Sequence, residues 1–190
     1  SQSTMSKLSD VIIKHGYEAL LDKVLIPEEQ LRARIAEMGA QITKDYHAKD
    51  LILVSVLKGG IVFLTDLMRT IGVPHHIDFM AVSSYGVGAR SSRGQPRITL
   101  DLNTDIKGRH VLLVEDIIDS GHSIDHVMRL LAARSPASLK VCSLLDKPSR
   151  REVYVPIAYL GFEIPNEFVF GYGLDLDEYC RNLTFIGTVK

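Results

Sequence analysis

Short, largely apolar runs alternate along the chain with stretches that have helical spacing. The runs at residues 51–57, 76–84, 110–114, 138–145 and 167–173 are typical of strands, the most apolar of them buried on both faces. In residues 26–46, 61–72 and 123–134 apolar positions recur three or four residues apart, which predicts helices. Pro27 and two acidic residues open the first helix. This alternation predicts an α/β fold with a mostly parallel central sheet and helices on both faces.

Composition narrows the class of protein. A chain of 190 residues predicts one domain, taken here as residues 5–190, and residues 1–4, ahead of Met5, are read as a remnant of an expression vector. Lys and Arg number 22 against 23 Asp and Glu, which argues against a non-specific nucleic-acid binder. Only Cys142 and Cys180 are present, so no disulfide framework is indicated. No apolar run is long enough for a bilayer, and we expect a cytoplasmic protein without a membrane partner.

The stretch after the strand at 110–114 carries candidate chemistry. Glu115 and Asp116 follow that strand directly, so they are expected at its carboxyl end, where charge costs little and ligands of parallel sheets bind. Residues 119–123, DSGHS, form a small-residue turn into a helix, whose N–H groups suit a phosphate. Acids that could hold hydroxyls or a metal, beside a phosphate cradle, point to a sugar phosphate. The alternative is that Ser123 merely caps the helix and the acids are solvated.

Residues 84–97 are rich in Gly, Ser and Arg and lack periodicity, which predicts a mobile lid over a site. Within them GVGARS, residues 86–91, has only two of the three glycines of a dinucleotide fingerprint and does not lie in a tight strand-to-helix turn. A GK[ST] phosphate loop is absent from the sequence, and the seven histidines show no metal-ligand spacing. A dinucleotide-binding protein is therefore disfavoured.

The segment VLLVEDIIDSGHSI, residues 111–124, resembles the phosphoribosyl-diphosphate signature of the type I phosphoribosyltransferases. Four further segments resemble the hypoxanthine-guanine branch of that family: VSVLKGG (54–60), SSYG (83–86), LLDKPSRR (144–151) and GFEIPNEFVFGYGLDLDEYCRNL (161–183). The resemblance implies the type I fold, with a small hood formed by terminal segments. It also implies purine salvage: Mg²⁺-dependent transfer of the 5-phosphoribosyl group from phosphoribosyl diphosphate to hypoxanthine or guanine, with xanthine left open, giving IMP or GMP and pyrophosphate.

The resemblance assigns the phosphoribosyl-diphosphate contacts. Pyrophosphate would be bound by Leu57, Lys58, Gly59, Gly60 and Arg181, with a strained, often cis, peptide before the lysine. Glu115 and Asp116 would hold the ribose hydroxyls and Mg²⁺. The 5-phosphate would be wrapped by Asp119, Ser120, Gly121, His122 and Ser123. His122 and Ser123 stand where many members have lysine and threonine; a solvent-facing His122 and a ligand contact both stay open.

The purine contacts and the partners follow from the same resemblance. Lys147 would donate to the 6-oxygen, Phe168 would stack on the base, and the backbone of Val169 and Asp175 would read the base edge. Taken alone, Phe168 would be interpreted as a core aromatic. Asp175 would ligate a second Mg²⁺, Asp119 would be the catalytic residue that stabilises a purine N–H, and Ser84 and Tyr85 in the lid would cover the reaction centre. The family's usual homodimer or homotetramer is expected.

Two other interpretations are weighed against this one. A regulatory protein could use the same fold to sense nucleotides and bind RNA, because a fold hosts many functions. This role would favour a basic face, and the composition offers little net positive charge, although Arg150 and Arg151 form a local cluster. An adenine or orotate phosphoribosyltransferase would share the phosphate motif but should lack Lys147 and the arrangement from Phe168 to Asp175.

Overall fold

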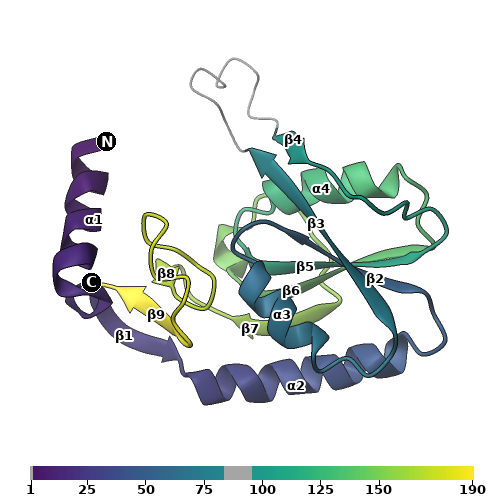
Figure 1. The fold of residues 1–190 in the computed structure, drawn as a ribbon, viewed down its shortest axis with the longest axis horizontal. Coiled ribbons are helices and arrows are strands. Elements are labelled where there is room, and N and C mark those ends of the chain that lie inside the picture. Colours follow the sequence, from purple (N-terminus) through teal and green to yellow (C-terminus); the bar gives the residue numbers. More distant parts are fainter. Residues whose placement is uncertain (1, 84–95) are drawn as a thin grey trace.

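A computed structural model describes residues 2–83 and 96–190, with side chains from Lys7 onward (Figure 1). Its larger sheet has six strands in the order β4-β3-β2-β5-β6-β7. The parallel strands are β2 (Leu51–Val56), β3 (His75–Ser83), β5 (His110–Ile118), β6 (Ser138–Asp146) and β7 (Tyr159–Glu163). The edge strand β4 (Arg97–Leu100) is antiparallel to β3. The predicted mostly parallel sheet is confirmed.

Helices cover both faces of this sheet, as predicted. On one face α2 (Glu28–Asp45) and α3 (Ile61–Met68) pack on β2, β5 and β6, and α4 (His122–Ala132) covers the other face (Figure 1). The apolar positions of α2 are buried as their spacing requires, namely Leu31, Ile35, Met38 and Ile42. Burying such a side chain contributes about 1.5–3 kcal/mol, so this packing holds α2 on the sheet.

The terminal segments form a second, three-stranded antiparallel sheet in the order β1-β9-β8. It comprises β1 (Leu21–Ile26), β8 (Val169–Phe170) and β9 (Ile186–Val189), with α1 (Gln2–His15) and the 3₁₀ turn η1 (Tyr17–Ala19) beside it (Figure 1). Phe170, Leu176 and Cys180 form its core, against which Ile12 and Leu20 pack. This unit is the predicted hood. Pairing of the two chain ends has no local signal, which is why α1, β1 and β9 were not predicted.

Several predicted boundaries were wrong. The strand expected at 167–173 is reduced to β8, because the glycines at 171 and 173 adopt positive φ and turn the chain. Strand β7 was missed, and Arg97, assigned to the lid, begins β4. Strand β5 continues to Ile118, because its pairing with β6 extends to Asp146. Glu115 and Asp116 therefore lie inside the strand rather than beyond it.

Candidate functional site

The turns after β2, β5 and β6 lie at the same end of the larger sheet, because these strands are parallel neighbours. They carry residues 57–60, 119–121 and 147–151. The hood's loop of residues 171–183, called the hood loop below, reaches the first of these turns: a Cβ on Gly173 would lie 2.3 Å from the carbonyl oxygen of Gly59. The structure thus brings together three of the predicted site segments at one edge and places the hood loop against the first of them.

The side chains of Glu115 and Asp116 are partly buried. Their charged forms therefore lose part of their hydration, which costs free energy. Burial, followed by the neighbouring Asp116 charge, raises the pKa of Glu115 well above its usual range. Burial also raises the pKa of Asp116, opposed by the hydrogen bond from the backbone N–H of Ile117 at 2.8 Å and by the charge of Arg181. The expectation that charge costs little here was wrong. A bound cation would offset this cost, so the pair suits a metal ion or polarised hydroxyl groups.

The turn after β5 leads directly into the N-terminus of α4. Gly121 is the N-cap residue, with φ 92°, a conformation that glycine adopts without steric cost. Ser123 lies within the helix and no side-chain hydrogen bond caps it, so the alternative in which Ser123 is merely a cap is wrong. Residues 115–121, 123 and 124 line a cavity of 250 Å³ that joins the acidic pair to the helix N-terminus. Its chemistry suits an anion with adjacent hydroxyl groups.

The side chain of His122 points into solvent and does not line that cavity. Its side chain is 61% exposed, and Nε2 lies 3.7 Å from Oε1 of Glu152. Because His122 does not line the cavity, the structure favours the solvent-facing interpretation over a direct ligand contact. Sequence alone could not separate these two, since both place a histidine at the first position of the helix.

The turn of residues 57–60 is shaped by close backbone approach. The Leu57–Lys58 peptide is cis, as the resemblance implied. A Cβ on Gly59 would lie 2.1 Å from Oδ2 of Asp116, so only glycine leaves room for that carboxylate. Lys58 is exposed, and its ammonium lies 3.0 Å from Oε2 of Glu178 in the hood loop. The turn therefore combines a backbone cradle with a solvent-accessible positive charge.

Arg181 faces this turn from the hood loop. Its Nη1 donates to the carbonyl oxygen of Gly173 at 2.8 Å, and Nη2 lies 3.2 Å from Glu178 and 3.8 Å from Asp175. Its buried Nε has no hydrogen-bond partner among the residues that the structure describes. Hydrogen bonds from Lys58 and Arg181, followed by the charges of these two side chains, lower the pKa of Glu178 below its usual range. Lys58 and Arg181 thus share Glu178, Arg181 also faces Asp175, and the Arg181 Nε is left as a donor for an incoming anion.

Lys147 and Phe168 occupy contrasting environments. Lys147 follows β6 and is 7% exposed, whereas Phe168 precedes β8 and is 64% exposed. The core-aromatic interpretation of Phe168 is therefore wrong. Val169 is buried in the hood sheet, and Asp175 accepts a hydrogen bond from the backbone N–H of Glu178 at 2.8 Å. An exposed aromatic ring is free to stack on a planar ligand.

Two arginines already engage Asp119, one through its carboxylate and one through its backbone carbonyl oxygen. Its carboxylate lies 3.0 Å from Nε of Arg150, and its carbonyl oxygen accepts a hydrogen bond of 3.2 Å from Nε of Arg151. Arg151 also pairs with the buried Asp146. The only signal in the sequence was the basic pair in LLDKPSRR, which gave no indication of its partners.

Two predicted features lie beyond what the structure tests. Ser84 and Tyr85, and the lid through residue 95, fall outside the described residues. In residues 2–83 and 96–190, no group of three or more His, Cys, Asp or Glu side chains could hold a metal ion. Glu115 and Asp116 nevertheless fit Mg²⁺, because this ion is usually held by one or two carboxylates together with waters and substrate oxygens.

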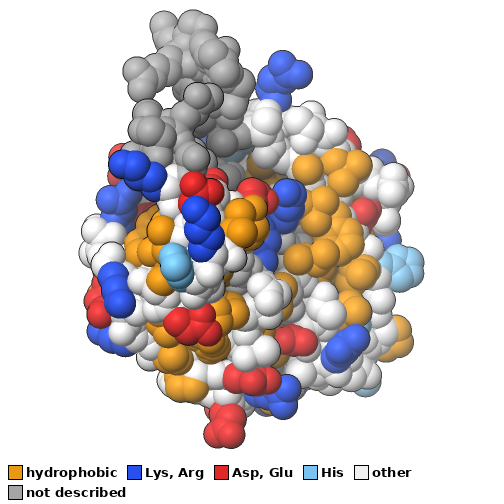
Figure 2. All heavy atoms as spheres, turned by 60° about the vertical axis from the view of Figure 1, so that its left-hand side comes forward, with side chains coloured by type: hydrophobic (Ala, Val, Ile, Leu, Met, Phe, Trp, Pro, Cys, Tyr) orange, Lys and Arg blue, Asp and Glu red, His pale blue; other side chains and the backbone are white. Residues whose placement is uncertain are grey.

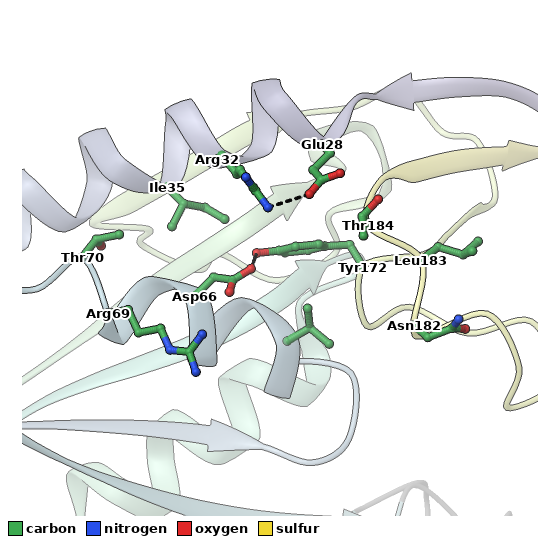
Figure 3. A pocket seen from close by; sticks show the side chains of 11 residues that line it. Glu28, Arg32, Ile35, Asp66, Arg69, Thr70, Tyr172, Asn182, Leu183 and Thr184 are labelled. Carbon is green, nitrogen blue, oxygen red and sulfur yellow. Dashed lines mark hydrogen bonds and ion pairs between the residues drawn. The ribbon is translucent and has the colours of Figure 1, made fainter.

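A larger cavity of 420 Å³ lies between α2, α3 and the hood loop (Figure 3). Arg32 and Glu28 form an ion pair of 2.8 Å at its wall, and the hydroxyl of Tyr172 donates to Asp66. None of its lining residues lines the smaller cavity. The Tyr172–Asp66 hydrogen bond joins the hood loop to α3, the helix that follows the turn of residues 57–60.

The surface charges and the lengths of the helices are relevant to two other partners, RNA and a membrane. Basic, acidic and hydrophobic side chains are interspersed on the face drawn in Figure 2, rather than gathered into a broad basic field. Arg150 and Arg151, a basic cluster in the sequence, are both paired with acids. Among the described residues, every helix is too short or too polar to cross a membrane. Both cysteines are free and buried.

Comparison with known proteins gives consistent results. Residues 27–177 match the family model described as "Phosphoribosyl transferase domain". The hypoxanthine phosphoribosyltransferase of Haemophilus influenzae is 54% identical over 169 residues, covering 87% of this chain and 94% of that protein. The hypoxanthine-guanine phosphoribosyltransferase of Mycobacterium tuberculosis is 51% identical, covering 91% and 88%. A solved hypoxanthine phosphoribosyltransferase from Staphylococcus aureus superposes with a TM-score of 0.87 at 43% identity, covering 94% and 96%.

Proposed function

The chain belongs to the phosphoribosyltransferase family, and from this we propose that it is a purine-salvage enzyme, a hypoxanthine-guanine phosphoribosyltransferase. The observation that carries the proposal is the acidic pair Glu115 and Asp116 leading, through a glycine turn, into a helix N-terminus. The enzyme transfers the 5-phosphoribosyl group of phosphoribosyl diphosphate to hypoxanthine or guanine. A purine nitrogen bonds to C1 of the ribose as the C1–oxygen bond to pyrophosphate breaks, and the purine nitrogen loses its proton.

The 5-phosphate binds at the turn of residues 119–123, where the backbone N–H groups and the helix dipole favour an anion. Glu115 and Asp116 accept hydrogen bonds from the ribose hydroxyls. The side chain of Ser120, which lines the cavity with Ser123, adds a hydroxyl donor. This arrangement fixes the ribose, so that C1 faces the turn of residues 57–60.

Pyrophosphate binds at Leu57, Lys58, Gly59 and Gly60, with Arg181 above them. Support comes from the narrow backbone at Gly59, the exposed Lys58 ammonium and the unpartnered Nε of Arg181 in the described part of the chain. Positive charge at this position stabilises the negative charge that develops as pyrophosphate leaves. Binding requires Lys58 and Arg181 to share or release Glu178.

Mg²⁺ is the cofactor we propose: Glu115 and Asp116, together with the ribose hydroxyls, would hold one ion, and Asp175 would hold a second. When bound, the metal neutralises charge on the diphosphate. The two acids would hold the ribose, and a bound cation would offset their burial and then their mutual repulsion, the two causes that raise the pKa of Glu115. Because the protein supplies few ligands, the metal should bind together with the substrate.

The purine lies between the base-reading residues Lys147 and Phe168. The Lys147 ammonium has donors and no acceptor, so it suits a 6-oxo group and leaves a 6-amino group unmatched. The exposed ring of Phe168 stacks on the base, and the backbone of Val169 and Asp175 reads its edge. Adenine should be rejected on these grounds.

Asp119 accepts a hydrogen bond from a purine N–H and stabilises the positive charge that the purine gains as its nitrogen bonds to C1, before the proton is lost. In the structure the Asp119 carboxylate is paired with the half-exposed Arg150, a contact that a bound base would have to share or displace. Ser84 and Tyr85 cover the reaction centre and exclude water. We also propose a homodimer or homotetramer in the cytoplasm, with small molecules rather than RNA as partners.

The experiment measures nucleotide formation from phosphoribosyl diphosphate with hypoxanthine, guanine, xanthine and adenine, each with Mg²⁺ and with a chelator. We expect metal-dependent turnover of hypoxanthine and guanine and no turnover of adenine. The assay with xanthine decides whether xanthine is also a substrate. A folded protein that binds phosphoribosyl diphosphate but turns over none of the four bases would contradict the enzyme assignment. Filter binding to RNA would then test the regulatory alternative.

A further inference from the structure

The segment that carries Lys147 lies directly against the turn that binds the phosphate. We call residues 147–153 the base-side segment and residues 118–122 the phosphate turn. The backbone N–H of Lys147 donates to the carbonyl oxygen of Ile118 at 3.0 Å. The carbonyl oxygen of Ser120 accepts from Glu152 at 2.9 Å and from Val153 at 3.3 Å. The two segments are therefore joined at both ends by backbone hydrogen bonds.

Arg151 crosses between these segments at their middle. Its Nε donates to the carbonyl oxygen of Asp119 at 3.2 Å, while its Nη2 pairs with the carboxylate of Asp146, the residue before Lys147. Its Cδ would lie 3.0 Å from a Cβ built on Gly121. The Arg151 side chain is 19% exposed and that of Asp146 is 8% exposed, so this pair is held away from solvent. One side chain thus bonds the Asp119 carbonyl oxygen in the phosphate turn and the Asp146 carboxylate at the strand end that precedes Lys147, with its stem beside Gly121.

We propose that Arg151 is a positioning residue that sets the distance between the phosphate subsite and the purine subsite. A nucleotide spans both subsites with a fixed length, so the phosphate turn and Lys147 must keep one spacing for both ends to bind together. The proposal rests on the proposed function. A planar guanidinium can bond Asp146 and the Asp119 carbonyl at once in fixed directions, and a lysine ammonium on a flexible stem cannot.

Arg150 shows that charge alone does not fill this role. Its ion pair with Asp119 involves side chains that are 52% and 46% exposed, and exposed pairs of this kind constrain geometry weakly. Arg151 differs because its partners are a buried carboxylate and a backbone carbonyl oxygen. Removing one partner of a buried pair leaves an uncompensated charge, whereas a lysine at this position keeps the charge and changes only the geometry of the contacts.

The test compares the wild type with R151K, R151M and the control R134K. Arg134 makes two hydrogen bonds to Asp101, at 2.8 and 3.0 Å, on the surface, so R134K is the same chemical change outside the site. Melting temperature, kcat and KM with hypoxanthine, and calorimetric affinities for IMP and for ribose 5-phosphate are measured for each. R151M retains most of the apolar stem beside Gly121 and removes the hydrogen bonds to Asp119 and Asp146. It is therefore a second test of whether these hydrogen bonds position the two subsites.

We expect R151K to melt within a few degrees of the wild type, to lose about tenfold or more in kcat/KM, and to lose at least tenfold more affinity for IMP than for ribose 5-phosphate. R134K should match the wild type in all of these. Equal losses for the two ligands, or unchanged IMP binding, would overturn the proposal, since Arg151 would then not couple the subsites. A wild type that makes no IMP would instead contradict the proposed function, which the same assay shows separately.

Discussion

In a Gly59→Ala variant the added methyl carbon would lie 2.1 Å from Oδ2 and 3.1 Å from Cγ of Asp116. Cβ atoms essentially never approach closer than 3.0 Å, so the carboxylate or the turn must move by about 1 Å. Asp116 cannot move freely, because its other oxygen accepts the Ile117 N–H at 2.8 Å. A misplacement of about 1 Å at a catalytic site can cost roughly 10²-fold in rate. We therefore expect kcat/KM for phosphoribosyl diphosphate to fall by about that factor.

Stability should respond differently in the same variant. Gly59 does not have a positive φ, so alanine is conformationally allowed there and restricts the unfolded chain by about 0.4–1 kcal/mol. This gain offsets part of the steric cost. The melting temperature is expected to stay within a few degrees of the wild type, because a shift of about 2–4 °C corresponds to 1 kcal/mol for a chain of this size.

Gly108→Ala provides the matched control. Gly108 has φ 72°, and nothing lies within 4 Å of the position that a Cβ would take. Alanine in this left-handed conformation costs about 1–2 kcal/mol, so this variant should melt at a lower temperature and keep its activity. Steady-state kinetics and thermal unfolding of both variants check the pair of outcomes. Wild-type kcat/KM in Gly59→Ala would refute the assignment of Asp116 and this turn to one site.

Three further outcomes are expected. Asp119→Asn should lower kcat far more than it weakens binding of phosphoribosyl diphosphate, because the amide loses the charge that stabilises the purine proton; steady-state kinetics with direct binding measurements check this, and an unchanged kcat would remove Asp119 from the mechanism. Lys147→Met should lower kcat/KM for hypoxanthine by about 10–100-fold, because it removes a hydrogen bond from a charged group. Assays with hypoxanthine and adenine in parallel check this, and wild-type activity with hypoxanthine would disprove the proposed role of Lys147. Glu115→Gln should raise the melting temperature of the metal-free protein at neutral pH while lowering turnover. Because folding raises the pKa of Glu115, protonation of this side chain favours the folded state. This contribution to the free energy of unfolding is full below about pH 4.3, the pKa of an unperturbed Glu, and is lost as the pH rises through the raised pKa. The difference in melting temperature between this variant and the wild type should thus vanish in acid, and a difference that persists there would contradict the desolvation argument.

Local sequence determined the parts of this protein that depend on short-range physics. The spacing of Leu31, Ile35 and Met38 predicted α2 and the face that it buries, because a helix repeats every 3.6 residues whatever it packs against. The run of residues 51–57 and the glycines after it predicted a buried strand and a close backbone turn. The small-residue turn after the strand at 110–114 predicted the helix N-terminus at which we propose that the 5-phosphate binds, because such an anion site needs only neighbouring residues.

Tertiary structure alone decided the features that join distant segments. The hood depends on β1 pairing with β9 across the 159 residues of chain between them, a contact that no local pattern encodes. Partial burial of Glu115 and Asp116 follows from the length over which β5 pairs with β6, which extended the strand past the end of its apolar run. The bond from Arg151 to the phosphate turn likewise exists only because two adjacent parallel strands end side by side. Hydrophobic periodicity specifies which face of an element is buried, whereas the partners of polar side chains depend on how the elements are assembled.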